Sequence, residues 1–494
     1  MSPTPALLAL RDRVRRHVPG ALLPAPLSQD DVQHLVRRLT WGATPTLVEE
    51  VRRDPQAWLD AQLEPAAIDD AACDALVRRF GRLSWSIPQT RGGGSFGNYD
   101  SMWELGQATL ARATWSRRQL LEVVCDFWSN HLNVTNPASD VWDNRHDYDA
   151  TVIRPHALGS FDAMLLASAR HPAMLRYLDN ATNTRGAPNE NYARELLELH
   201  TVGVDAGYGE EGVRAAARVL TGAAVDDATG LYRYDERRHD PGAAAVMGWS
   251  TGAHSAADGQ RVQADLVRHL AHHPRTAATI ARKLCVRFVA DDPPAALVER
   301  LAATYLAQGT RVVPVLRQLF ASPEFWAARR TKTRRPLEGF VAAVRAIGST
   351  PGPSGLGGMD YLYWQARDIG MAPLAWAPPN GYPDVAVAWQ SAGATMRRWN
   401  KTTEVVNGWW PADLRRGDLA VLLPRPLPDT FGEVVDALLA RLLGRPATAR
   451  ERSVLLAFCE RSAVTPLRAD DEWITWRLPS VVQTVLHAPG HMER

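Results

Sequence analysis

Cysteine is scarce in this 494-residue chain, which has four, at positions 73, 125, 285 and 459. Cysteines this few and this widely spaced exclude a disulfide framework, a zinc knuckle and a redox pair, so we expect four buried thiols. Long apolar runs are also absent. No run approaches the roughly eighteen apolar residues of a membrane-spanning helix, so the sequence predicts no transmembrane segment.

A surplus of charge of either sign is missing too. The 56 Lys and Arg residues nearly balance the 54 Asp and Glu residues, for a formal net charge of +2. This balance provides no long-range field toward nucleic acid or an anionic membrane, so no nucleic-acid partner is expected. At the N-terminus the short apolar run ALLAL precedes the arginines, which is the reverse of a secretory signal. These features predict a cytoplasmic protein.

Well-supported catalytic motifs are absent as well. The chain has two Gly-x-Ser-x-Gly matches, GGSFG at 93–97 and GWSTG at 248–252, but neither follows a convincing strand pattern, as the Ser of a nucleophile elbow would, so a nucleophilic triad is poorly supported. Its glycine-rich segment at 91–98 (RGGGSFGN) lacks the Gly-Lys-Ser/Thr ending of a phosphate-binding loop, so we expect a loop or lid there. Convincing strand alternation and internal repeats are also missing, which leaves helices as the main secondary structure.

Helical patterns run through most of the chain, and they predict an all-α fold with a single large multi-helix domain. A long, ordered Pro/Gly-rich loop is expected at 348–389. The predicted division is an N-terminal extension at 1–27, a main helical domain at 28–410 and a C-terminal helical part at 411–494, packed on the same domain. The predicted helices lie at about 28–64 (a pair), 103–134, 149–157, 161–169, 189–202, 210–221, 260–272, 274–290, 294–308, 311–320, 334–347, 390–407, 429–443, 447–460 and 470–487.

The segment 189–203 (NENYARELLELHTVG) is the most distinctive helix. At about 100° per residue, its polar side consists of Glu190, Asn191, Arg194, Glu195 and Glu198. Its other side consists of Tyr192, Ala193, Leu196, Leu197, Leu199 and His200. One interpretation is a solvated charge ladder of residues spaced four apart. The other is the wall of a polar pocket, which the crowding of Asn, Arg and Glu without Lys favours.

A series of segments, taken in order, carries a family resemblance. They are LVRRLTWGATP (36–45), DFWSNHLNV (126–134), IRPHALGSFDAML (153–165), PAMLRYLDN (172–180), NENYARELLELHTVGVDAGY (189–208), AARVLTG (216–222), HDPG (239–242), HPRTAATIARKLCVRFVADDPP (273–294), SPEFW (322–326), RPLEGFVAAVRAIG (335–348), and PPNGYPD with Trp389 (378–389). The chain resembles the bacterial domain of unknown function 1800 (DUF1800) family.

The resemblance implies a mostly helical protein of about this length, with no settled activity to carry over. Members of the family often look exported. They are often encoded beside a protein similar to the alkaline phosphatase and sulfatase group, which is therefore the expected partner. This chain departs from the family at His200, where an aromatic residue is common, and at Tyr382, where Trp is common.

Carboxylates near an arginine can perform general acid–base hydrolysis, with one group protonated and the other ionised. A loop histidine and aspartate in HDPG could add an oriented acid or base. The seventeen tryptophans would suit a glycan substrate. The alternative is that the same groups hold loops in place through buried hydrogen bonds. The candidate catalytic residues are Glu190, Arg194, Glu195, Glu198, His239 and Asp240.

Further residues are candidates for binding. His131 follows an apolar stripe of Leu120, Val124 and Phe127, so it is either a hydrogen-bonded core histidine or a pocket residue beside two asparagines. The candidate binding residues are Asn130, His131, Asn133, Asn189, Asn191 and Trp389.

A divalent metal is the one cofactor that the residues suggest. The candidate ligands are His131, Glu195, Glu198 and His239. The Glu-x-x-His pair of helical di-metal sites is absent, because Glu198 precedes His200 by two residues.

The leading hypothesis is a hydrolase-like enzyme with a Glu/Arg/His pocket that acts on a polar substrate such as a glycan or peptide. One alternative is a non-catalytic binding or scaffold partner of another enzyme that uses segment 348–389 and its aromatic residues. A second alternative is a metal-dependent oxidoreductase.

Overall fold

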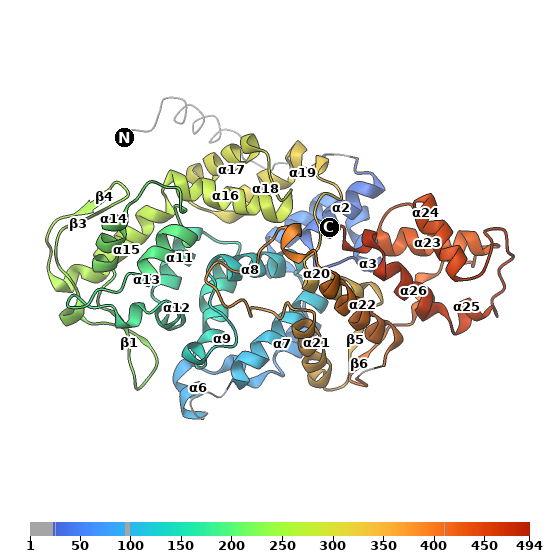
Figure 1. The fold of residues 1–494 in the computed structure, drawn as a ribbon, viewed down its shortest axis with the longest axis horizontal. Helices are drawn as coiled ribbons and strands as arrows, with labels where there is room; N and C mark the ends of the chain where they lie inside the picture. The colour runs from blue at the N-terminus through green and yellow to red at the C-terminus, as the bar shows by residue number, and fades with distance from the viewer. Residues whose placement is uncertain (1–22, 25, 94–98, 410) are drawn as a thin grey trace.

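Helices stack into an elongated body in the computed structural model, which describes residues 23–24, 26–93, 99–409 and 411–494 (Figure 1). The helices of residues 161–271, in green, lie toward one end of the long axis, and those of 431–487, in red, lie at the other. The predicted all-α fold class is confirmed. Most of the predicted extension 1–27, and residues 94–98 of the glycine-rich segment, lie outside the described residues.

The first half of the chain contains α2 (Gln29–Leu39), α3 (Pro45–Arg53), α4 (Pro55–Leu63), α5 (Ala71–Val77), α6 (Ile87–Gly93), α7 (Asp100–Trp115), α8 (Gln119–His131), α9 (Arg145–Tyr148), α10 (Arg154–His156), α11 (Phe161–Ala169), α12 (Pro172–Tyr177), α13 (Asn191–Glu195) and α14 (Glu210–Val219). The second half contains α15 (Gly259–Ala271), α16 (Pro274–Phe288), α17 (Ala295–Ala307), α18 (Val312–Phe320), α19 (Pro323–Ala327), α20 (Pro336–Ala346), α21 (Leu356–Asp368), α22 (Ala392–Asn407), α23 (Phe431–Leu443), α24 (Ala449–Phe458), α25 (Glu472–Thr475) and α26 (Leu478–His487). Among the described residues, none of the helices is both long and apolar enough to cross a membrane.

Three short antiparallel strand pairs interrupt the helices, although the sequence predicted no strands. They are β1 (Ala223–Val225) with β2 (Tyr232–Tyr234), β3 (Ala244–Val246) with β4 (Trp249–Thr251), and β5 (Thr350–Pro351) with β6 (Leu414–Arg415). Strands of two or three residues are too short to show an alternating pattern, which explains why the sequence does not reveal them.

The segment 348–389 is ordered, but its first half holds the helix α21. That helix buries Met359, Leu362 and Tyr363, at the spacing of one helical face. It packs on α7 at Gly106, where a Cβ atom would lie 2.4 Å from Cε2 of Tyr363. The loop proper therefore runs from 369 to 385, and the glycines at the start of α21 hide the helix from sequence analysis.

Helix α8 lies in the middle of the body (Figure 1). Its apolar stripe is buried as predicted, from Leu120 through Val124 and Phe127 to His131. Trp128 is buried as well, and its ring stacks on Phe161 of α11 with 5.4 Å between ring centroids. The helix therefore contributes to the core on more than one side.

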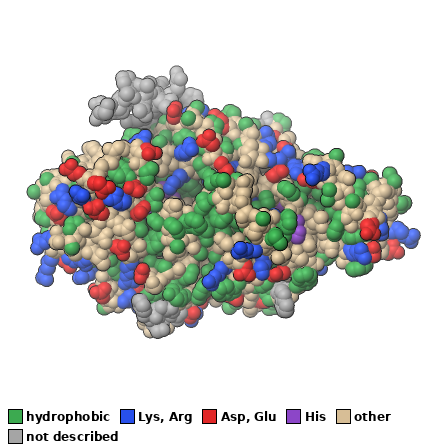
Figure 2. Space-filling model, in the orientation of Figure 1, with side chains coloured by type: hydrophobic (Ala, Val, Ile, Leu, Met, Phe, Trp, Pro, Cys, Tyr) green, Lys and Arg blue, Asp and Glu red, His purple; other side chains and the backbone are tan. Residues whose placement is uncertain are grey.

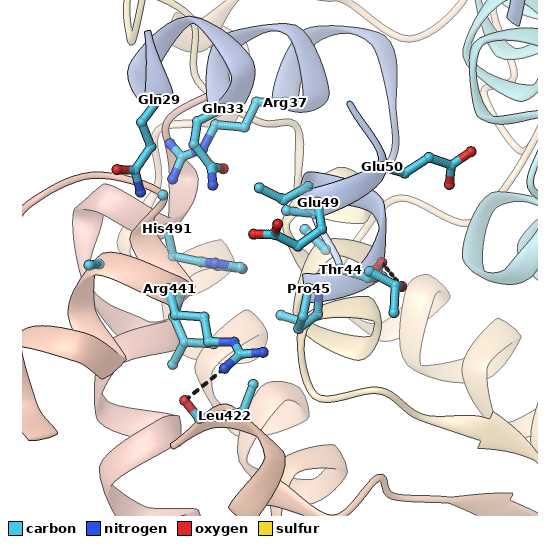
Figure 3. A pocket seen from close by; sticks show the side chains of 18 of the residues that line it. Gln29, Gln33, Arg37, Thr44, Pro45, Glu49, Glu50, Leu422, Arg441 and His491 are labelled. Atoms are coloured by element: carbon cyan, nitrogen blue, oxygen red, sulfur yellow. Dashed lines mark hydrogen bonds between the residues drawn. The ribbon is translucent and has the colours of Figure 1, made fainter. Parts of the chain in front are cut away.

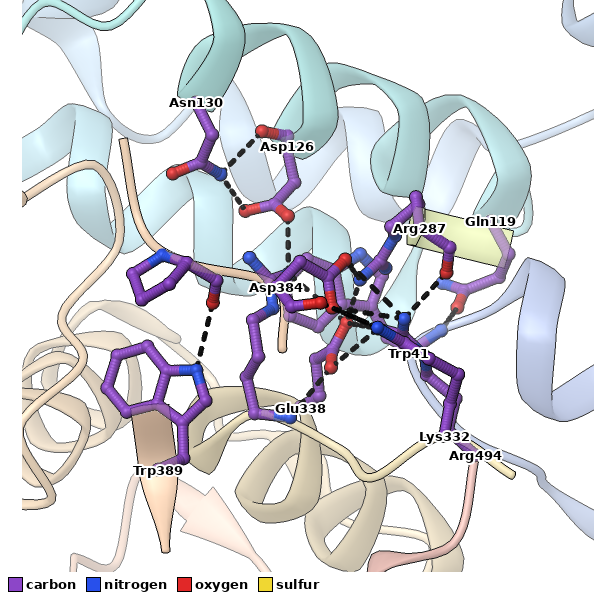
Figure 4. A network of polar contacts seen from close by, with 12 residues as sticks. Trp41, Gln119, Asp126, Asn130, Arg287, Lys332, Glu338, Asp384, Trp389 and Arg494 are labelled. Atoms are coloured by element: carbon purple, nitrogen blue, oxygen red, sulfur yellow. Dashed lines mark hydrogen bonds and ion pairs between the residues drawn. The ribbon is translucent and has the colours of Figure 1, made fainter. Parts of the chain in front are cut away.

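A buried network of charges joins distant parts of the chain around Glu338 (Figure 4). Arg494 donates from Nη1 to both carboxylate oxygens of Glu338, at 2.7 and 2.9 Å. Arg335 donates to the same carboxylate at 3.1 Å, and Arg287 of α16 also donates to it. The side chains of these four residues are at most 4% exposed.

The network extends to the loop through Asp384. Its carboxylate lies 3.2 Å from Arg494 and 3.3 Å from both Arg287 and Lys332. Lys332 also pairs with Asp291 at 2.5 Å, and Nζ of Lys332 donates to the backbone carbonyl of Asp384 at 2.6 Å. The loop 369–385 is thus attached to the body by ions as well as by apolar packing.

Burial alone would raise the pKa of Glu338, but the charges of Arg287, Arg335 and Arg494 outweigh burial and hold that pKa well below its ordinary value. A carboxyl group with a lowered pKa in the folded state stabilises the fold above its unfolded pKa. That stabilisation disappears as the pH falls through the lowered value.

We predict that Glu338→Gln lowers the free energy of unfolding by about 3–5 kcal/mol at pH 7, because three buried arginines lose their shared counter-ion. Urea unfolding of both proteins measures the difference. The difference should shrink as the pH falls from 4.5, the unfolded pKa, toward the lowered folded pKa, because the unfolded wild type then takes up a proton at Glu338 while the folded wild type stays ionised. Glu299→Gln on the exposed face of α17 is the matched control, with a change within about 0.5 kcal/mol. Equal stabilities of wild type and Glu338→Gln at pH 7 would contradict the prediction.

Candidate functional site

The predicted polar helix around residue 194 is α13, which continues as a π-helical turn, η6 (Leu196–His200). The two asparagines at its start form backbone contacts: the Asn189 side chain accepts a hydrogen bond from the Asn191 backbone N–H at 2.9 Å. Asn191 Nδ2 also donates to Asp179 at 3.1 Å. The apolar side is buried at Tyr192 and Leu196, so the helix is amphipathic as predicted.

Arg194 is the centre of the polar face. Its guanidinium lies 3.2 Å from Glu190, 3.7 Å from Glu198 and 2.7 Å from Glu210 at the start of α14. The side chains of Arg194 and Glu190 are each 34% exposed. The face is therefore neither a fully solvated ladder nor a closed pocket wall.

Glu195 stands in different surroundings from Glu198. Burial raises the pKa of Glu195, and the negative charge of Glu198 raises it further, against the opposing charge of Arg194. Two tyrosines are near enough to sense these carboxylates: burial, with a contribution from the charge of Glu195, raises the pKa of Tyr177 to about 12, and burial with Glu198, and to a smaller extent Glu195, raises the pKa of Tyr208 to about 12. Glu195 is thus partly buried, and it is near two tyrosine side chains and a second carboxylate, that of Glu198.

The loop 369–385 reaches this face through Tyr177. The Tyr177 hydroxyl donates to the Ala377 carbonyl at 2.6 Å. Asn133 Nδ2 donates to the carbonyls of Trp376 and Pro378 on either side, at 2.9 and 2.8 Å. The candidate binding residue Asn133 therefore holds the loop beside α12 and α13.

Two other candidate binding residues also hold this loop. Asn130 Oδ1 accepts from the Tyr382 backbone N–H at 2.9 Å. Gly381 sits against Asn130, where a Cβ atom would lie 2.2 Å from the carbonyl oxygen, and its φ of +70° also favours glycine. Trp389 Nε1 donates to the Pro383 carbonyl at 2.9 Å.

His131 belongs to a cluster with Lys283 of α16. Lys283 Nζ donates to His131 Nδ1 at 2.9 Å and to the Leu199 carbonyl at 3.2 Å. Since an ammonium group only donates, Nδ1 is the acceptor and Nε2 carries the proton, which it donates to the His200 carbonyl at 3.1 Å. Burial and the charge of Lys283 hold the pKa of His131 well below its ordinary value.

Lys283 is not among the residues predicted from the sequence. The chain has only three lysines, and within its described part Lys332 and Lys401 pair with carboxylates while Lys283 forms no ion pair. Burial lowers the pKa of Lys283 to about 8, and its side chain remains half-buried. The scarcity of lysine in an arginine-rich chain is the signal that points to it, because burial shifts the pKa of a lysine into the neutral range more readily than that of an arginine.

His239 and Asp240 lie in a separate cluster. His239 is fully buried, with its Nδ1 donating to the Thr221 carbonyl at 2.9 Å and its Nε2 2.9 Å from His254 Nε2. Asp240 accepts from the Gly242 backbone N–H at 2.8 Å. Among the described residues, no interaction links this pair to the polar face of α13, so the structure does not bring together the two parts of the predicted catalytic set.

The candidate metal ligands are divided in the same way. Glu195 and Glu198 share the α13 face, whereas His131 points to Lys283 and His239 to His254. Over the ranges that the structure describes, no group of three or more His, Cys, Asp or Glu side chains is placed to hold a metal ion. These residues thus offer no preformed ligand set.

The chain belongs to the family described as "Protein of unknown function (DUF1800)", whose family model matches residues 34–492. The match includes the polar face of α13, the Lys283 cluster, the C-terminal helices and every member of the charge network except Arg494. No curated protein and no solved structure gives a significant match to the chain.

We predict that Lys283 is acetylated by dilute acetic anhydride with a rate that reaches half its maximum near pH 8, because burial favours its neutral amine. Peptide mass spectrometry across a pH series measures the rate. Lys401, paired with Asp368 and Glu404, is the internal control in the same sample. A Lys283 rate that keeps rising past about pH 10, the range of an ordinary lysine, would refute the prediction.

Proposed function

We propose that this protein is a hydrolase-like enzyme that uses the polar face of α13 and η6 for general acid–base chemistry. The observation that carries the proposal is the unequal surroundings of two neighbouring carboxylates. Burial raises the pKa of Glu195, and the charge of Glu198 adds to it, whereas Glu198 itself lies 3.7 Å from the cation of Arg194. Contrasting environments of this kind separate an acid from a base within one site.

The roles follow from these environments. Glu195 holds a proton and transfers it to the leaving-group atom of the substrate as the bond breaks. Glu198, beside Arg194, accepts a proton from the water molecule whose hydroxyl group attacks. The π-helical turn η6 (Leu196–His200) supports this assignment, because π turns within helices are frequent at functional sites.

The proposed substrate is polar, such as a glycan or a peptide. Support comes from a row of three aromatic rings, two on the loop 369–385 that Tyr177 holds and one just after it. Trp376, Tyr382 and Trp389 follow one another with ring centroids 5.1 and 5.9 Å apart. The two tryptophans are half-buried, so each keeps part of its surface open to a ligand.

A second proposal is a binding role for segment 348–389, with the phosphatase- or sulfatase-like protein as partner. Its support is Trp364 on α21, which is 39% exposed. The ring lies 5.5 Å from Trp103, and the Arg367 guanidinium stands 5.0 Å over it. The other aromatic residues of the segment, Tyr361, Tyr363, Trp376, Tyr382 and Trp389, are buried or half-buried and hold the segment down.

For the enzyme proposal we predict that Glu195→Gln lowers kcat by about 10²- to 10⁴-fold on whichever member of a panel of nitrophenyl glycosides and peptide nitroanilides the wild type hydrolyses. In Glu198→Gln, the pKa of Glu195 should fall toward 4.5, because one repelling charge is removed. Carbon-13 NMR titration of the glutamate carboxyl groups measures that shift.

Glu210→Gln is the matched control, since it removes a partner of Arg194 on α14 and leaves the face of α13 intact. The enzyme proposal fails if Glu195→Gln keeps full activity, or if no panel member is hydrolysed and Glu195 titrates at the same pH in wild type and Glu198→Gln.

For the binding proposal we predict that Trp364→Ala weakens binding to the purified phosphatase- or sulfatase-like protein encoded beside this one by about tenfold or more, with little change in Tm. Trp476→Ala, at a tryptophan that is 64% exposed and lies near the far end of the body, is the control. Titration calorimetry measures both. Equal affinities of the two variants, or no binding by the wild type, would rule out this surface.

A further inference from the structure

A cleft of about 910 Å³ opens between α2, α3 and α23, in the half of the body away from α13 (Figures 1 and 3). Its volume falls in the range of small-molecule sites, roughly 300–1,000 Å³. Small side chains leave this space open: Ala342 and Ala346 of α20, and Ala437 and Ala440 of α23, are part of its lining.

Positive charge predominates in the cleft, which five arginines and two glutamates line. Both glutamates have arginine neighbours, because Glu50 lies 3.7 Å from Arg117 and Glu49 lies 2.5 Å from Arg52. Among the described residues, neither of these glutamates forms an ion pair with the other four lining arginines, which are Arg37, Arg53, Arg334 and Arg441.

Three of these arginines line the cleft from different parts of the chain, Arg37, Arg334 and Arg441. Within the described ranges, Arg334 and Arg441 form no ion pair, and each donates instead to a backbone carbonyl, that of His491 and that of Leu422. Arg37 lies 3.9 Å from the carboxylate of Glu493.

Arg334 is the most deeply placed of the three. Its side chain is buried, and burial with the nearby charge of Arg37 lowers the pKa of Arg334 to about 9. A buried guanidinium without a counter-ion is unfavourable, and an anion bound in the cleft would supply one.

Two side chains that line the cleft each carry a buried acceptor without a hydrogen-bond partner among the described residues, Gln33 Oε1 and His491 Nδ1. His491 Nε2 lies 3.0 Å from the Gly339 carbonyl, so Nε2 carries the proton and Nδ1 can only accept. Gln33 is 6% exposed and His491 2%. Figure 3 shows both side chains among Arg37, Arg441 and Glu49 around the cleft.

Gly444, which ends α23 with a φ of +63°, keeps room for the Gln33 amide. A Cβ atom there would lie 2.6 Å from Gln33 Oε1 and 3.1 Å from Arg37 Nη2. The glycine thus allows the acceptor and the cation to approach the end of α23 together.

We propose that this cleft binds a small hydroxylated organic phosphate. The phosphate group lies against Arg37, Arg334 and Arg441, because guanidinium groups match phosphate oxygens in charge and in hydrogen-bond geometry. The hydroxyl groups donate to Gln33 Oε1 and His491 Nδ1, which otherwise lack donors. This site is separate from the α13 face and does not depend on the proposed hydrolase.

The test is titration calorimetry of the full chain at constant ionic strength, with glucose 6-phosphate, inorganic phosphate and glucose as probes. We expect glucose 6-phosphate to bind at one site per chain, more tightly than inorganic phosphate, and glucose to give no heat of binding. Arg441→Gln should raise the Kd for glucose 6-phosphate about tenfold, because it removes one charged hydrogen-bond donor.

Two further variants separate binding from folding. Glu49→Gln removes a carboxylate that acts on Arg441, so it should tighten the binding of both phosphates, a gain that misfolding cannot produce. Gln33→Met keeps the shape of the side chain but removes its acceptor, so it should abolish the preference for glucose 6-phosphate over inorganic phosphate. Arg261→Gln, on the exposed side of α15, is the control with unchanged affinity.

The proposal is overturned if neither phosphate binds saturably to the wild type, or if Arg441→Gln, Glu49→Gln and Arg261→Gln all share its Kd. Equal wild-type affinities for glucose 6-phosphate and inorganic phosphate would overturn the assignment of the hydroxyl contacts. Loss of this binding has no bearing on hydrolysis by Glu195, so the two proposals succeed or fail independently.

Discussion

The carboxylate of Glu338 is the point on which the body of this protein depends, because arginines from three separate parts of the chain converge on it. Arg287 comes from α16, Arg335 precedes α20 and Arg494 lies at the end of the chain. A carboxylate this deeply buried is tolerated only when several cations and hydrogen bonds surround it. The same requirement fixes where α16, α20 and the C-terminal segment sit relative to one another.

The loop beside the α13 face takes its position from this network. Asp384 attaches one end of the loop to Arg494 and Lys332, and Asn133 and Tyr177 hold its middle. The aromatic rings of the loop are therefore carried on a rigid support. Buried ions and backbone hydrogen bonds thus place the loop beside Tyr177, whose pKa the charge of Glu195 helps to raise.

Much of this helical architecture could be predicted from the sequence. The stripe of α8 and the two sides of α13 follow from spacing within one helix, which local residues determine. The helix α21 was harder to predict, because glycines at 355, 357 and 358 resemble a loop and its buried side is apparent only against α7. The strands have only two or three residues each, too few to show an alternating apolar pattern in the sequence. The candidate site was only partly predictable: Glu195 and Glu198 share a face as expected, whereas His239 does not join them.

The sequence by itself determined that the chain is helical, which residues of α13 lie on its polar side, and that its segments from 36 to 389 resemble one family. Tertiary structure alone decided which distant residues meet. Lys283 reaches His131 across 152 positions, and Arg37, Arg334 and Arg441 surround one cleft. The physical reason is that helical periodicity depends on neighbours three and four residues away, whereas such meetings depend on how separate helices pack.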